Sequence, residues 1–129
     1  MGIAMEEVVL KPAPGPPKYT PDQQKEEEGR TLLSRVDPSA EVLIVLDERG
    51  ALLTSHELAT LLQEMEDDGV RLATFAIGGA HGHSPEVRKK ANKIISLSKM
   101  VMNHQIARLV LMEQIYRAYT IIRGVPYHK

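Results

Sequence analysis

The sequence predicts an α/β fold with a mostly parallel sheet and helices on both faces. Two apolar runs, 42–46 and 72–77, have the composition of buried strands, and each is followed by a helix-start signal. A third strand is expected at 96–102, before a long final helix. Because parallel strands need helical crossovers, this alternation favours a layered α/β domain. A chain of 129 residues without cysteine can bury its own core, so we expect one domain over 1–129.

Residues 1–19 differ from the rest and are expected to be irregular. Six of the eight prolines lie in the first forty residues, and four of them fall in 11–18. Proline lacks the backbone donor that sheets and helices need, so 11–18 is predicted to be an extended, exposed loop. A short strand is the most that 7–10 can form.

The first regular elements are a helix and a buried strand. Thr20 followed by proline is a helix-start signal, which predicts a helix over 22–36 with its glutamates 26–28 on a solvated face. The continuous aliphatic run 42–46 then predicts a strand buried on both faces. We expect a turn at Arg49-Gly50.

A second helix and strand follow. Thr54 to Glu57 has the pattern of a capping box, and Gly69 supplies a helix end. The strand expected at 72–77 leads into a glycine-rich segment, 78–84.

The remaining elements are also delimited by local signals. Ser84 followed by proline predicts a helix from 85 to about 95, and a short strand is expected over 96–102. Asn103 caps a long helix that runs to about Arg123 and ends at Gly124.

Three segments are predicted to meet at one edge of the sheet. Ligands of parallel sheets bind outside the carboxyl ends of the strands. That rule selects Leu46-Asp47, the loop 78–84 and the stretch 98–104.

The loop 78–84 is the first candidate site. Its glycines let a ligand approach the backbone and leave amides free at a helix start, although glycine-rich turns also exist only to turn the chain. His81 and His83 have the spacing of metal ligands, but no third ligand follows. We therefore expect two exposed loop histidines and no metal site.

The final helix is apolar on more than one face. Such a helix in a small domain is wrapped into the core or paired with a second chain, and homodimerisation is the favoured interpretation. Glu113 and Arg117 are spaced to form a local ion pair.

Charge is distributed unevenly along the chain. The net charge is −1, but residues 85–129 hold nine Lys/Arg and two Asp/Glu, a local charge of +7. A basic segment of this kind indicates an anionic partner for one face. No apolar run reaches the roughly 20 residues of a membrane span, and the first ten residues, with Glu6 and Glu7, do not have the pattern of a signal peptide.

Several stretches together carry a family resemblance. They are Ile77-Gly78-Gly79-x-x-Gly82, Ser96-Leu97-Ser98-Lys99-Met100, Asn103-His104-Gln105 with Arg108, Glu113-Gln114-x-Tyr116-Arg117-Ala118, and Arg123-Gly124-x-x-Tyr127-His128-Lys129. In this order, and with the strand Ile44–Asp47, they resemble the large-subunit ribosomal RNA methyltransferase H family. These are pseudouridine N3-methyltransferases of the SPOUT superfamily, which has an α/β trefoil knot in its C-terminal half.

The resemblance implies a cofactor, partners and a location. It implies an S-adenosyl-L-methionine (AdoMet) pocket built from three loops, with Leu46, Gly78, Gly79, Ser98, Lys99, Met100, Val101, Met102 and Asn103. It implies a homodimer through the last helix, in which the tail of one subunit completes the site of the other. The substrate would be a pseudouridine in large-subunit ribosomal RNA on assembled ribosomes, without metal or membrane. The location would be the cytoplasm of a bacterium, or a plastid or mitochondrion of a eukaryote.

The resemblance also assigns catalytic roles. Pseudouridine N3 must lose a proton before it attacks a methyl group, which calls for a base or for a cation that stabilises the imidate. His104, or His128 of the partner subunit, is expected to remove the proton. Arg108 or Arg117 would hold a phosphate or the imidate oxygen.

One departure from the family concerns the start of the chain. Family members begin with a further strand and helix before the segment matched by 8–10, and this chain has only 1–5 there. We therefore expect the sheet to lack one strand of the family.

Two other functions fit the same residues. One is a non-enzymatic α/β module that binds a nucleotide or RNA through the glycine loop and the basic segment. The other is a dimeric structural subunit whose apolar final helix is its functional surface.

Overall fold

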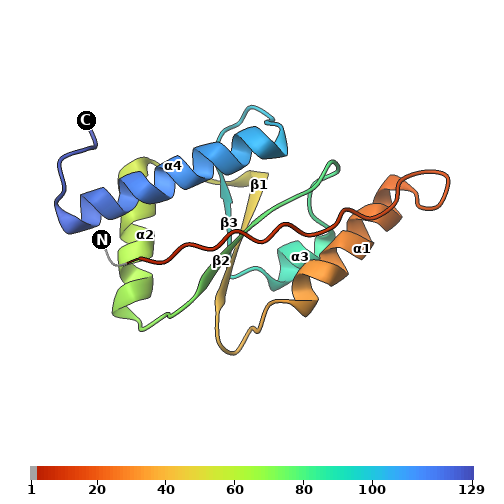
Figure 1. The fold of residues 1–129 in the computed structure, drawn as a ribbon, viewed down its shortest axis with the longest axis horizontal. Helices are drawn as coiled ribbons and strands as arrows, with labels where there is room; N and C mark the ends of the chain where they lie inside the picture. Colours follow the sequence, from red (N-terminus) through yellow and green to blue (C-terminus); the bar gives the residue numbers. More distant parts are fainter. Residues whose placement is uncertain (1–2) are drawn as a thin grey trace.

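The computed structural model describes residues 3–129 as a three-stranded parallel sheet flanked by helices (Figure 1). The strand order is β2-β1-β3. The elements, in chain order, are α1 (Pro21–Ser34), β1 (Val42–Leu52), α2 (Ser55–Asp67), β2 (Ala73–Ile77), α3 (Pro85–Lys90), β3 (Lys93–Ser96) and α4 (His104–Arg123). The predicted α/β class with a parallel sheet is confirmed.

Helices cover both faces of the sheet because successive side chains of β1 alternate between them. Leu43 and Val45 pack against α1 and α3 on one face. Ile44 and Leu46 pack against α4 on the other. The two helical layers lie on opposite sides of the strands in Figure 1, with α2 next to α4.

Local capping signals set the helix boundaries correctly. The side chains of Thr20 and Thr54 each accept a hydrogen bond from the backbone amide of the third residue of their helix. In return, the side chains of Gln23 and Glu57 accept from the backbone amides of the two threonines. Asn103 caps α4, which ends at Gly124 in the left-handed conformation.

The predicted end of the third helix and the predicted position of the third strand are wrong. The helix expected over 85–95 stops at Lys90, and the strand is β3 rather than 96–102. The cause is a pairing of Asn92 with β1. The backbone amide of Asn92 donates to the Leu43 carbonyl at 2.8 Å, and its side-chain oxygen accepts from the Leu43 amide at 2.7 Å. This contact draws the chain into the sheet immediately after α3.

The turn expected at Arg49-Gly50 is instead an irregularity within β1. The strand continues to Leu52, and its register against β3 shifts between Leu46 and Ala51. A Cβ on Gly50 would lie 2.8 Å from backbone atoms of Ile94, so this close approach requires glycine.

The N-terminal segment contains no helix or strand over residues 3–20, so the short strand considered for 7–10 is absent. The loop 11–18 is largely exposed, as predicted. In Figure 1 this segment crosses the molecule before it reaches α1. No helix among residues 3–129 is long and apolar enough to cross a membrane. Two expectations stay predictions: that the C-terminal half forms a trefoil knot, and that the sheet lacks one strand of the family.

Candidate functional site

The three segments selected from strand polarity leave the sheet at one edge. Leu46 of β1 is paired with Ile77 at the end of β2 and with Ile95 of β3. Because β2 and β3 flank β1, the loops that begin at Gly78 and at Leu97 start on opposite sides of Leu46. This is the edge at which parallel sheets bind their ligands.

The glycine loop, residues 78–82, is a tight turn that only glycine permits. Gly79 and Gly82 form an isolated bridge, and the Gly82 amide donates to the Gly79 carbonyl at 3.1 Å. Gly82 has a φ of +80°, and a Cβ on Gly78 would lie 2.9 Å from the Gly82 carbonyl carbon. The loop thus exposes backbone where a side chain would block it.

Helix α1 packs directly against this loop. A Cβ on Gly79 would lie 2.6 Å from the Oε1 of Glu28, and the other Glu28 oxygen accepts the Ala13 amide at 3.0 Å. A Cβ on Gly29 would likewise lie 2.6 Å from the Ser84 hydroxyl oxygen. Glu28 is therefore partly buried and linked to the N-terminal segment, which corrects its prediction as part of a solvated face.

The third loop, between β3 and α4, is shaped by two serines. The Ser96 hydroxyl donates to the Ser98 carbonyl at 2.8 Å, and the Ser98 hydroxyl accepts the Met100 amide at 2.9 Å. Lys99 is exposed, and the side chains of Met100 and Val101 are 78% and 82% exposed. Two neighbouring apolar side chains facing solvent at this edge indicate a surface that a ligand or partner covers.

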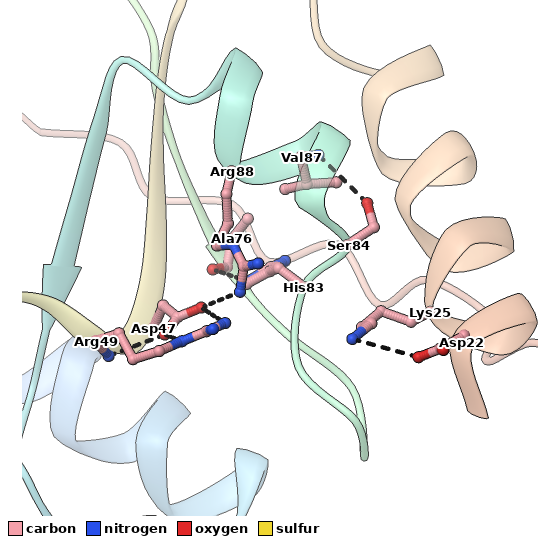
Figure 2. A network of polar contacts seen from close by, with 9 residues as sticks. All are labelled: Asp22, Lys25, Asp47, Arg49, Ala76, His83, Ser84, Val87 and Arg88. Carbon is pink, nitrogen blue, oxygen red and sulfur yellow. Dashed lines mark hydrogen bonds and ion pairs between the residues drawn. The ribbon is translucent and has the colours of Figure 1, made fainter.

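A buried polar network lies beside the glycine loop (Figure 2). Asp47, at the end of the paired part of β1, is buried and accepts hydrogen bonds from the backbone and guanidinium of Arg49 at 2.9–3.3 Å. Arg88 of α3 approaches Oδ2 of Asp47, which also accepts from Arg49, at 3.5 Å. A buried carboxylate needs such partners because desolvation opposes its charge. Asp47 was predicted to lie at this edge, whereas no local pattern in the sequence points to Arg88.

His83 belongs to the same region and is only 7% exposed, so its prediction as an exposed loop residue is wrong, whereas His81 is exposed. Its Nε2 lies 3.1 Å from the Ala76 carbonyl oxygen, which can only accept, so Nε2 carries the proton. Burial lowers the pKa of His83 below its ordinary value, against the opposing effects of the Ala76 carbonyl and the Asp47 charge. The ring is thus held neutral. Within residues 3–129 no group of three His, Cys, Asp or Glu side chains is arranged around a metal.

The four residues predicted to be catalytic form two pairs at different positions on α4. His104 and Arg108 are exposed near its start, and Arg108 contacts Glu7 at 2.7 Å. Arg117 lies nine residues further along, which corresponds to about 13 Å of helix.

The second pair is a cluster in which the C-terminal tail folds back onto α4. Arg117 donates to Glu113 at 2.6 Å and to the Nδ1 of His128 at 3.1 Å. The Tyr127 hydroxyl also donates to Glu113, and its ring packs edge-on against Tyr116. Hydrogen bonds from Arg117 lower the pKa of Glu113 and raise that of Arg117. The predicted local pair therefore anchors the tail as well.

Comparisons with known proteins agree with this arrangement. A family described as predicted SPOUT methyltransferase matches residues 2–128. Ribosomal RNA large subunit methyltransferase H of Maridesulfovibrio salexigens is 44% identical over 124 residues, 96% of this chain and 78% of the relative. The proteins of the same name from Desulfovibrio desulfuricans and Geotalea daltonii are 46% and 47% identical and cover 84% and 83% of this chain, 68% and 69% of theirs.

The family match covers residues 2–128 and therefore includes all three loops at this edge of the sheet. The resemblance inferred from the sequence is confirmed. The chain belongs to the SPOUT methyltransferase family.

Proposed function

We propose that this protein transfers a methyl group from AdoMet to N3 of a pseudouridine in large-subunit ribosomal RNA. The observation that carries the proposal is the convergence of three loops at one sheet edge in a chain whose relatives are named ribosomal RNA large subunit methyltransferase H. AdoMet, when bound, supplies a methyl group on a positively charged sulfur, so the protein needs chiefly to align donor and acceptor.

The residues present fit such a donor. Leu46 and Gly78 lie at the paired ends of β1 and β2, and close packing of Gly78 against the Gly82 backbone, 2.9 Å from where a Cβ would lie, keeps this turn free of a side chain. Ser98 to Asn103 provide the opposite wall, where Met100 and Val101 are exposed and available to cover an apolar or aromatic group. These loops would hold the cofactor largely through backbone groups.

The protein is proposed to act as a homodimer through α4. Exposed apolar side chains lie at helical spacing along one stripe of this helix, at Ile106, Leu109, Met112 and Tyr116. Two antiparallel copies of α4 would bring the start of one helix to the end of the other. His104 and Arg108 would then lie near Arg117 and His128 of the partner subunit, which unites the two pairs that a single chain keeps apart.

His104 is the preferred base. The Nδ1 of His128 accepts a hydrogen bond from Arg117, so its neutral ring carries a proton on Nε2 and has no nitrogen free to take another. His104 is exposed at the first position of α4, beside the proposed donor site. Arg108 and Arg117 would stabilise the negative charge on the imidate oxygen or bind a phosphate.

Calorimetric titration with AdoMet, followed by methylation of ribosomes that carry unmethylated pseudouridine, tests the proposal. We expect binding to a folded dimer, and alanine at His104 or Arg108 should reduce methylation while AdoMet affinity is kept. A folded protein that does not bind AdoMet would contradict the proposal. Binding without methylation would favour the non-enzymatic nucleotide- or RNA-binding module.

A further inference from the structure

Both ends of the glycine loop are fixed by a single buried side chain. His83 follows Gly82 directly, and its Nε2 donates to the carbonyl of Ala76, which lies two residues before Gly78. The bond therefore closes the base of the loop from one side to the other.

A second contact ties the neighbouring strand to the helix that follows the loop. Asp47 comes directly after Leu46, and Arg88 lies on α3, which begins two residues after His83. Their 3.5 Å contact joins the end of the paired part of β1 to α3. Figure 2 draws the contact of Arg88 with Asp47 and that of His83 with Ala76.

Burial distinguishes this arrangement from a surface ion pair. The Asp47 side chain is 5% exposed and that of Arg88 is 25% exposed. Pairs in such surroundings are screened little by salt, and loss of one partner leaves a buried charge. His83 and the Asp47–Arg88 pair, here called the edge latch, therefore hold the two donor-binding backbones in one relative position.

We propose that the edge latch positions the glycine loop and Leu46 for the methyl donor, and thereby sets donor affinity without taking part in methyl transfer. The inference rests on the proposed function, because the donor is AdoMet. None of the three side chains is proposed to touch reacting atoms. They are positioning residues, and they act before the chemical step.

The first test compares variants of His83. H83F keeps a ring of similar size but removes the donor to Ala76, whereas H83Q retains an amide donor. We expect H83F to raise the Kd and KM for AdoMet roughly tenfold with kcat within about twofold of wild type, and H83Q to recover most of the affinity. An unchanged Kd in H83F, or an equal fall in kcat, would overturn the proposal.

The second test uses Arg88 and its neighbour. R88M removes a partner of Asp47 at the margin of the network and should also weaken AdoMet binding. K89M removes the same charge from an exposed side chain of the same helix and should bind like wild type. Equal affinities of R88M and K89M for AdoMet would contradict the proposed role of the edge latch. If H83F does not fold, the comparison of R88M with K89M alone tests that role.

A measurement without donor separates this inference from the proposed function. Amide hydrogen exchange of Gly79 and Gly82 should be faster in H83F than in wild type when no ligand is present. Equal exchange would contradict the latch. If wild type does not bind AdoMet but H83F still exchanges these amides faster than wild type, the proposed function is contradicted and the positioning role of His83 is supported.

Discussion

Arg117 donates a hydrogen bond to the Nδ1 of His128 at 3.1 Å, and this contact holds the C-terminal tail against the helix from which it departs. The same guanidinium is fixed by Glu113, which also accepts from Tyr127. One arginine thus organises a tail that contains two side chains suited to nucleotide recognition. These contacts all lie within one chain.

Replacement of Arg117 should release this tail. In R117M, Glu113 loses its cation and His128 loses its donor, so we expect amide exchange to accelerate over 125–129 and methylation to fall more than about tenfold. R123M is the matched control, because it removes an arginine of the same helix whose partner, Glu66, lies on α2. That variant should keep its activity and most of its stability, because solvent-exposed ion pairs contribute little. Similar losses of activity in both variants would contradict a specific role for Arg117.

The stability of the protein should fall in mild acid because of His83. Its pKa in the folded state lies below the ordinary value of 6.5, so below about pH 6.5 the unfolded chain binds a proton that the folded chain does not. The free energy of unfolding should therefore decrease as the pH falls below about 6.5 and should be insensitive to His83 above it. Urea unfolding at about pH 5.5 and about pH 7.5 measures this change. H83Q should lose part of the pH dependence, and an identical slope in the two proteins would be inconsistent with a buried neutral His83.

Dimerisation should depend on the exposed stripe of α4. Leu109 is 64% exposed in the isolated chain, and L109E would place a charge at the centre of the proposed interface. We expect L109E to sediment as a monomer and to lose methylation. Leu72 is comparably exposed at 55% but lies outside α4, so L72E should leave the sedimentation coefficient unchanged. A dimeric L109E would exclude this face of α4 as the interface.

The contact between β1 and β3 should not tolerate a side chain at position 50. A Cβ there would lie 2.8 Å from the Ile94 carbonyl, so the backbone of the edge strand β3 would have to shift away from β1. G50A should therefore destabilise the protein by about 1–3 kcal/mol in urea unfolding, whereas A51S, at an exposed neighbour, should have little effect. Equal midpoints for G50A and wild type would show that β3 can shift.

The features predicted correctly are those set by neighbouring residues. The caps at Thr54 and Ser84 are local hydrogen bonds within three residues, so the sequence indicated where α2 and α3 begin. The aliphatic run 42–46 likewise predicted a strand buried on both faces, because this signal is also carried by neighbouring residues. Its last residue then located the edge of the sheet at which the loops gather.

The features that were missed depend on contacts distant in the sequence. The placement of β3 follows from the pairing of Asn92 with Leu43, which lies 49 residues away. Burial of His83 depends on the Ala76 carbonyl and on Asp47, and a histidine between glycine and serine carries no local sign of burial. The position of Glu28 against Gly79 likewise requires the packing of α1, which glutamate-rich composition does not indicate.

The central claim is tested most directly by mass spectrometry of a ribosomal RNA stem-loop after incubation with the protein and AdoMet. The RNA is supplied within assembled ribosomes in two forms, with pseudouridine or with uridine at the same position. The account predicts one added methyl group on the pseudouridine form, located at N3, and none on the uridine form. Equal methylation of both forms, or none on either by a protein that binds AdoMet, would contradict it.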